Sequence, residues 1–497
     1  MKSYARLLAL ILALVMVVSA FAGCGSDTPE KESETSAKTE AGTEGATTEV
    51  LTEQETEEIM PDIDQKNYKE EFYLNILPDV NPPDFYWVKE ASDSVLSNAL
   101  YNRQENVRKY LGVDIIGIST DGENRYVEPF KNAVKNKDGS VDTLVSHVYY
   151  GIDGFITGNY LTDILDIPEI DVYADYWKYD VMEDIAANDH FYLGFSDFNI
   201  FYTHVITFNK TLLAKYEDQL DEDLYTTVEN YRWTLDKMIS VASLAYTDAQ
   251  SDGKTEDDTF GFVSSTEYIG FAGMIQGFGI KLVDRNEKGD YVMSCYTEEN
   301  KQRMSNIVDK VYNLVRSEYA YMPQDKNPSP TMGNGRALMT INGTYWLSNL
   351  LSTGVDFGVL PYPMYDEAQK EYRSLQWGGY ICVPSYMGEG DRPTMIGETL
   401  EMLSYYSDEV NIAFYEKMLG KQVAEAPQDR KMLDIVWDSV CSELALTYYS
   451  VIKDENNYVY CLAQLTREGT TANLSSYVAR SQNAINNGLK KFFKKLK

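Results

Sequence analysis

The sequence has few of the residues on which enzymes and metal proteins depend. Only 3 of its 497 residues are histidine and 5 are cysteine. The cysteines form no CxxC pair, and the histidines form no HExxH motif, so zinc-ribbon, redox and metalloprotease patterns are absent. There is also no GxSxG elbow and no glycine-rich phosphate loop after a strand. We therefore expect no cofactor and no catalytic residue. Glycoside hydrolysis by a carboxylate pair stays open in principle, although no local spacing singles out a pair.

Positive charge is also scarce. The chain carries 44 basic and 77 acidic residues, which gives a formal net charge of −33. Nucleic-acid binding requires a basic surface, so this composition excludes nucleic acid as a partner. An acidic balance of this size is typical of a soluble protein that anionic polymers repel.

Long apolar runs are missing except at the start of the chain. Lys2 and Arg6 precede an apolar stretch at Leu7–Val18, and small residues follow it. This order is typical of a secretory signal, and the run is shorter than the ~20 residues of a membrane-spanning helix. The stretch Phe21-Ala22-Gly23-Cys24 resembles a bacterial lipobox, with Phe21 where most have Leu. The resemblance implies cleavage after residues 1–23 and lipidation of Cys24. An ordinary secretory signal with an incidental cysteine is the alternative.

The segment after Cys24 is poor in large apolar side chains. Residues 24–60 consist mainly of Thr, Glu, Ser, Gly and Ala. Such a segment cannot bury enough apolar surface to offset its ordering entropy. We expect a disordered acidic tether that would span ~30–35 Å as a neutral flexible chain, and further as a charged one.

The remaining residues are too many for one ordinary core, so we expect at least two domains. Beyond Cys24 the cysteines are Cys295, Cys382, Cys441 and Cys461. Cys441 and Cys461 could pair in an oxidising compartment, while free buried thiols are an equal alternative.

Strand and helix patterns alternate along this body, which predicts an α/β fold with mostly parallel sheets. Amphipathic spacing predicts a helix over 93–111, ended by Gly112. Further helices are expected at 233–245 and 398–406. The expected strands are 71–77, 113–118, 141–145, 205–208, 337–341, 357–360 and 380–383.

Three groups of motifs, taken in order, resemble family-1 extracellular solute-binding proteins, the class of the maltodextrin-binding receptors. The first group is YLTDILDIPEI at 160–170, ITFNK ending at Lys210, and WTLD at 233–236. The second is GRALMTING at 335–343 followed by Ser348-Asn349. The third is DFGVLPYP at 356–363, then Gly378-Gly379-Tyr380 and Val383-Pro384.

The resemblance implies a two-lobed periplasmic-binding-protein-like fold with hinge-crossing strands and a ligand cleft between the lobes. By the family pattern, lobe one holds 65–200 and 380–440, and lobe two holds 205–376 and 445–497. The crossings are expected near 199–203, 376–380 and 446–452. The implied role is extracellular capture of a small solute, a mono- or oligosaccharide, for an ABC importer. A peptide, a polyol or another solute, or presentation of ligand to a membrane sensor, are the alternatives.

A sugar needs aromatic rings for its CH face and fixed polar groups for its hydroxyls. Tyr345 stands where the family places a stacking aromatic, with Trp346 beside it. Loops after strands and residues at the crossings supply the other candidates. The expected ligand-binding residues are Tyr345, Trp346, Trp377, His147, Ser146, Tyr149, Asp79, Asn81 and Tyr202.

One acidic turn resembles the start of a calcium loop. Asp248, Gln250 and Asp252 alternate, Gly253 holds the sixth place, and Glu256 follows. Thr259 occupies the twelfth place, where a bidentate Glu is usual, and Gln250 replaces the usual Asp or Asn. We therefore predict no metal, and keep this turn as a weak candidate beside the simpler interpretation of an acidic surface loop.

Overall fold

The computed structural model describes residues 59–77, 83–119, 127–147, 151–251, 253–264, 268–323, 329–420, 427–448, 450–452 and 471–496. The predicted leader, Cys24 and all but the last two residues of the predicted tether lie outside these ranges. So do Asp79, Asn81, Tyr149, Asp252 and Cys461. No helix within the described ranges, including the 23-residue C-terminal one, is long and apolar enough to cross a membrane.

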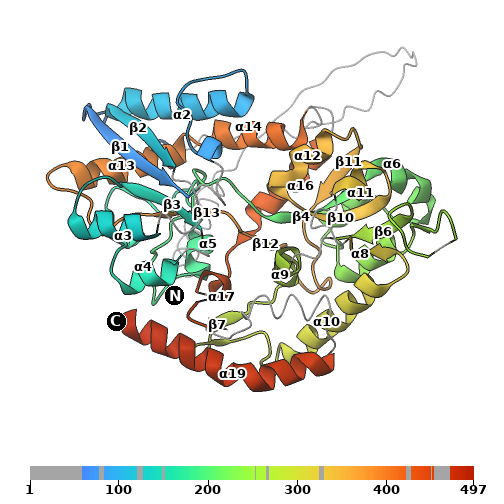
Figure 1. The fold of residues 1–497 in the computed structure, drawn as a ribbon. Helices are drawn as coiled ribbons and strands as arrows, with labels where there is room; N and C mark the ends of the chain where they lie inside the picture. The colour runs from blue at the N-terminus through green and yellow to red at the C-terminus, as the bar shows by residue number, and fades with distance from the viewer. Residues whose placement is uncertain are drawn as a thin grey trace, which may run out of the picture. The chain divides into compact units, whose positions relative to one another are not determined.

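The first sheet has the strand order β13-β3-β1-β2 (Figure 1). Its strands are β1 (Glu70–Ile76), β2 (Val113–Ser119), β3 (Thr143–His147) and β13 (Gly379–Cys382). β1 runs parallel to β2 and β3, whereas β13 joins β3 antiparallel and places Gly379 opposite His147. The chain thus returns to this sheet after more than 200 residues, so the sheet contains two separate parts of the sequence.

Helix α2 (Val95–Leu111) packs against β2 and shows how the sequence sets its ends. The Ser94 side chain accepts a hydrogen bond from the Ser97 backbone N–H, as an N-cap does. Gly112 closes the helix at φ 67°, a left-handed conformation that favours glycine. Two later helices pack against α2, namely α13 (Arg392–Tyr405) and α14 (Asp408–Leu419).

The second sheet has the order β11-β4-β10-β6-β5, with β9 also paired to β6. Its strands are β4 (His204–Asn209), β5 (Tyr246–Thr247), β6 (Thr259–Val263), β9 (Ala320–Tyr321), β10 (Ala337–Gly343) and β11 (Phe357–Leu360). β10 is parallel to β6, but β4 is antiparallel to both β10 and β11. The expectation of a mostly parallel sheet is wrong here. β4 follows the segment 199–203, and its first residue, His204, pairs with Gly343 at the end of β10, so β4 runs opposite to β10.

The other helices are short except α10 (Lys301–Arg316) and α19 (Thr471–Phe493), which pack on each other along the lower part of Figure 1. The remaining described α-helices are α3 (Val127–Asn136), α4 (Ile152–Thr157), α5 (Tyr179–Asp184), α6 (Lys210–Leu213), α7 (Leu224–Glu229), α8 (Leu235–Ala242), α9 (Tyr268–Gly277), α11 (Ser329–Gly333), α12 (Leu347–Leu351), α16 (Pro427–Asp438) and α17 (Leu444–Thr447). Two small two-stranded sheets complete the described fold: β7 (Val283–Arg285) with β8 (Tyr291–Met293), and β12 (Ser374–Leu375) with β14 (Val440–Cys441).

Two chain segments pass side by side between the large sheets. Asn199 donates a side-chain hydrogen bond to the Gly379 carbonyl at 3.0 Å. The Tyr202 backbone N–H donates to the Gln376 side chain at 3.2 Å. A Cβ on Gly378 would stand 3.2 Å from both the Ile200 carbonyl oxygen and the Tyr202 Cβ of the other segment. The glycine therefore permits the close approach of the two crossing segments.

The cysteines of the described ranges are Cys295, Cys382 and Cys441, and all three are buried. Burial raises the pKa of Cys441 to about 12, with smaller effects from neighbouring charges. At neutral pH this thiol is therefore protonated and unreactive. Whether Cys461 pairs with it lies outside the described residues.

Candidate ligand site

The ends of three strands and the crossing segments bring aromatic side chains together. β3 ends at His147, β4 begins at His204, and Gly343 at the end of β10 pairs with His204. Parallel and crossing strands present their ends at a common edge, where loops carry binding side chains. The end of β3, the start of β4 and the end of β10 therefore lie in one region, although they are far apart in the sequence.

Tyr345 lies at the centre of these side chains, which we term the aromatic cluster. Its members are Phe85, His147, Tyr202, His204, Tyr345, Trp346 and Trp377. Tyr345 belongs to the short 3-10 helix η4 (Thr344–Trp346) directly after β10. Its ring makes edge-to-face contacts with Tyr202 at 6.2 Å, with Trp346 at 4.9 Å and with Phe85 at 5.5 Å between ring centroids. Such geometry is the favoured one for aromatic pairs. The Tyr345 ring is therefore held in a fixed orientation.

The backbone beneath Tyr345 is tied to the crossing segment. The Thr344 N–H donates to the Thr203 carbonyl at 2.8 Å, and the Thr344 hydroxyl lies 3.3 Å from the Phe201 carbonyl. A Cβ on Gly343 would stand 3.0 Å from both the Tyr202 and Trp346 rings. The glycine thus lets the two rings approach the backbone. The hydrogen bonds from Thr344 to the crossing segment 199–203 hold the aromatic cluster in place.

Trp377 and His147 form a second pair next to Tyr202. Their rings meet edge to face at 5.0 Å, and His147 Nε2 lies 2.7 Å from the Trp377 carbonyl oxygen. The Trp377 N–H donates to the Tyr202 carbonyl at 2.7 Å, which links the two groups of aromatics. Burial lowers the pKa of His147 to about 4 against a smaller opposing effect of its hydrogen bond. At neutral pH the ring is uncharged, so Nε2 carries the proton that it donates to the carbonyl.

Exposure distinguishes the members of this aromatic cluster. His147 is buried, whereas Tyr202, Tyr345 and Trp377 are half-buried, and Trp346 is 45% exposed. Most large aromatic side chains prefer to be covered, and Trp346 is one of few exposed ones in the described ranges. Partly open rings fixed by edge contacts are suited to stacking on an apolar ligand face.

The structure thus brings together five of the residues expected from the sequence: Tyr202, Tyr345, Trp346, Trp377 and His147. Ser146 is different, because it is buried within β3 opposite Tyr380. Tyr149, Asp79 and Asn81 lie outside the described residues.

Sequence reasoning missed two members of the aromatic cluster. Phe85 lies in the 3-10 helix η1 (Pro83–Phe85), where no motif marks it, and Lys417 Nζ lies 4.3 Å from its ring centroid. His204 begins β4, and its ring lies 5.9 Å from that of Tyr202. No motif marks His204 either.

In the acidic turn, a carboxylate accepts hydrogen bonds from backbone N–H groups of the same turn. Asp248 accepts hydrogen bonds from the N–H groups of Gln250 and Gly253, at 3.3 and 3.2 Å. Arg336 contacts the Glu256 carbonyl and the next carboxylate, Asp257, both at 2.7 Å. Within the described ranges, which omit Asp252, no three acidic, cysteine or histidine residues are grouped closely enough to hold a metal.

Comparison with known proteins was informative only at the level of structure. No protein-family model matches the chain, and no curated protein matches it significantly. The maltose-binding periplasmic protein MalE from Listeria monocytogenes, solved with maltose, is 12% identical with a TM-score of 0.50, over 86% of this chain and 97% of that one. A cyclo/maltodextrin-binding protein solved with maltotetraose is 12% identical with a TM-score of 0.50, over 85% and 96%.

These similar structures are binding proteins, and their likeness extends over nearly their whole length. At such low identity the likeness concerns the fold, and it agrees with the resemblance to family-1 solute-binding proteins noted in the sequence. The chain therefore has the two-lobed α/β fold of the maltodextrin-binding proteins.

Proposed function

We propose that the protein is an extracellular solute-binding receptor that captures a mono- or oligosaccharide and delivers it to an ABC importer. The aromatic cluster around Tyr345 carries this proposal. Its rings are held by edge contacts and by the crossing segments, and Trp346 and Tyr345 remain partly open. A preformed, partly apolar surface with few polar groups is typical of small-molecule sites.

The two large sheets form the cores of the two proposed lobes. Lobe one holds 65–200 and the returning segment from residue 380, and lobe two holds 205–376 and 445–497. We assign α16 to lobe two, although the family pattern extends lobe one to residue 440. Asp429 of α16 is buried and accepts hydrogen bonds from Lys210 Nζ at 2.6 Å and from the Val359 N–H at 3.2 Å. Both partners adjoin the second sheet.

A saccharide fits the chemistry of the aromatic cluster better than a charged ligand. The clustered side chains are aromatic, and the one histidine with a buried ring is neutral above about pH 4. Sugars offer an apolar CH face to such rings. The similar proteins were solved with maltose and maltotetraose. A polyol would use the same rings, while a peptide would need backbone partners in addition.

Lipidation of Cys24 and the acidic tether would hold the receptor at the outer face of the cytoplasmic membrane of a bacterium. We propose the permease subunits of the importer as its membrane partner and a monomer as its state. A membrane sensor is the alternative partner. We propose neither a catalytic activity nor a cofactor, and no nucleic-acid contact.

Thermal melting with a panel of ligands tests the ligand class. Mono- and oligosaccharides, polyols, amino acids and short peptides would each be added to the purified protein. A ligand at a hundred times its Kd adds ~2.7 kcal/mol of stability, which raises the midpoint measurably. A rise with one saccharide series supports the proposal. A rise only with peptides or amino acids would keep the fold and reject the saccharide.

A further inference from the structure

A pocket of about 340 Å³ shares no lining residue with the aromatic cluster, and the proposed function does not account for it. One wall comes from the segment 165–191 of proposed lobe one, which includes α5, and the other from residues 281–291 of proposed lobe two, which include the β7–β8 hairpin. Leu444 also lines the pocket. The volume lies within the range of small-molecule sites.

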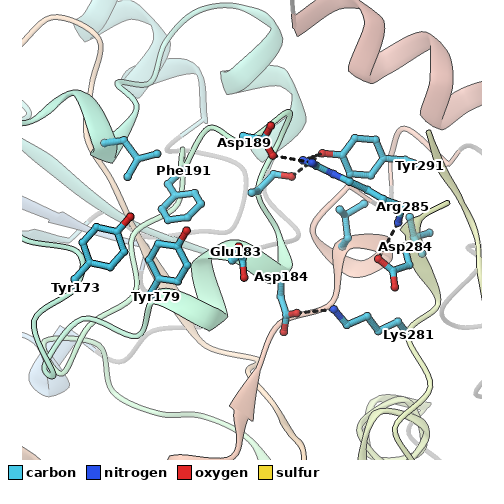
Figure 2. A pocket seen from close by; sticks show the side chains of 14 residues that line it. Tyr173, Tyr179, Glu183, Asp184, Asp189, Phe191, Lys281, Asp284, Arg285 and Tyr291 are labelled. Atoms are coloured by element: carbon cyan, nitrogen blue, oxygen red, sulfur yellow. Dashed lines mark hydrogen bonds and ion pairs between the residues drawn. The ribbon is translucent and has the colours of Figure 1, made fainter. Parts of the chain in front are cut away.

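The first wall carries a shelf of aromatic rings. Tyr173 and Tyr179 are stacked with their centroids 5.1 Å apart, and Phe191 meets Tyr179 edge to face at 5.2 Å. Figure 2 shows these three rings on one side of the pocket and the basic side chains on the other. Tyr173 is 67% exposed, and Leu165, which also lines the pocket, is 45% exposed. Large side chains exposed together beside a pocket often mark a binding site.

The second wall holds two cations that are already neutralised. Arg285 contacts Asp189 at 2.7 Å and the Tyr291 hydroxyl at 2.6 Å, and Lys281 contacts Asp184 at 2.9 Å (Figure 2). Their guanidinium and ammonium groups are therefore engaged with acceptors from the protein. A bound anion would have to compete with these carboxylates.

Two further carboxylates line the pocket, and one of them, Asp284, accepts a hydrogen bond from the Arg285 backbone N–H at 2.8 Å. Glu183 on α5 and Asp284 on β7 are both exposed. Neither forms an ion pair within the part of the chain that the structure describes. The four acids and two bases of the lining thus leave it with an excess of negative charge.

The pKa values of two side chains that line the pocket, Lys281 and Tyr179, are both raised. Burial lowers the pKa of Lys281, but the charges of Asp184 and Asp284 outweigh burial and raise it. Burial and the charge of Glu183 raise the pKa of Tyr179. The rise for Lys281 is expected where the local potential is negative, whereas the rise for Tyr179 comes mainly from burial.

We propose that this pocket binds a small organic cation, with an alkylammonium or quaternary ammonium group placed between the tyrosine shelf and the exposed carboxylates of Glu183 and Asp284. Aromatic faces attract such cations through their quadrupole, and carboxylates add charge attraction. The shelf supplies apolar contact for methyl groups, which an inorganic cation would not use. This proposal does not depend on the saccharide proposal, because the two sets of residues do not overlap.

Calorimetric titration with choline tests the proposal, with 3,3-dimethylbutan-1-ol as the uncharged molecule of the same shape. We expect choline to bind with a Kd of about 1 mM or lower and the alcohol to bind at least ~10-fold more weakly. Equal binding of the two molecules, or no heat with choline at tens of millimolar, would overturn the proposal.

Variants locate the binding. The double variant Glu183→Gln, Asp284→Asn keeps both shapes and is expected to weaken choline binding ~10-fold or more. Tyr173→Leu is expected to weaken it severalfold by removing one ring of the shelf. Glu287→Gln, in the turn of the β7–β8 hairpin but outside the lining, is the matched control and should change the Kd less than ~2-fold. Because the substituted residues are exposed, we expect the variants to fold, and melting curves check that they do. Binding that survives the double variant would place choline elsewhere and refute the assignment.

Discussion

Acidification should destabilise the fold through His147. Its ring is 1% exposed, and burial lowers its pKa from 6.5 to about 4. Between these two values the unfolded chain binds a proton that the folded chain does not. The free energy of unfolding therefore falls as the pH drops from 6.5 toward 4, and this contribution is constant outside that window.

The magnitude follows from the two pKa values. At about pH 4.5, proton uptake by the unfolded chain lowers the free energy of unfolding by roughly 2.5 kcal/mol. At about pH 7.5 the effect is almost zero. Urea unfolding at both values measures the difference. Burial also lowers the pKa of His204 to about 4, so this residue adds a loss of similar size.

The variant His147→Gln isolates this contribution. A glutamine amide can donate to the Trp377 carbonyl in place of Nε2, but it does not titrate. We expect the variant to be less stable at neutral pH but to lose roughly 2–3 kcal/mol less than the wild type on acidification. The losses from His204 and from carboxylates occur in both proteins and cancel. Equal losses in the two proteins would show that His147 is not buried in a neutral form.

Three other changes give separate tests. Trp346→Ala removes a half-exposed ring, so calorimetry should find weaker saccharide binding while the unfolding free energy changes by less than ~0.5 kcal/mol; a large loss of stability would mean that the ring is structural. Asp429→Ala leaves the Lys210 ammonium group without its buried partner and should cost ~3–5 kcal/mol in urea unfolding; a cost under ~1 kcal/mol would contradict the described packing of α16. Cys24→Ser should move the protein from the membrane fraction to the soluble fraction of cells with ligand affinity unchanged; retention on the membrane would refute the lipid anchor.

Much of the local structure could be predicted because it is encoded by neighbouring residues. Buried apolar runs predicted β1, β2, β4, β10, β11 and β13 within two residues. Helix α2 begins after the N-cap Ser94 and ends at Gly112, which adopts the left-handed conformation. β3 begins at Thr143 and runs to His147, two residues later than expected. α13 begins at Arg392, six residues before the expected start, because Pro393 in the first turn was not recognised as a helix start.

Features that depend on distant contacts could not be predicted from local patterns. The direction of β4 depends on where the crossing segment enters the second sheet, and no property of residues 204–209 specifies it. Phe85 joins the aromatic cluster through Tyr345, which is 260 residues away. The pocket of Figure 2 combines segments near residues 165–191 and 281–291. By contrast, Trp377 was found because the adjacent Gly378-Gly379 pair marks the crossing.

The most direct test of the central claim is calorimetric titration of the protein and of Tyr345→Ala with the saccharide that raises the melting midpoint most. Loss of a stacking ring should weaken binding by ~1–3 kcal/mol, which is about 5- to 150-fold in Kd. Tyr312→Ala on α10, away from the aromatic cluster, is the matched control and should leave the Kd unchanged. An unchanged Kd for Tyr345→Ala, or equal weakening by both variants, would contradict the assignment of the aromatic cluster as the saccharide site.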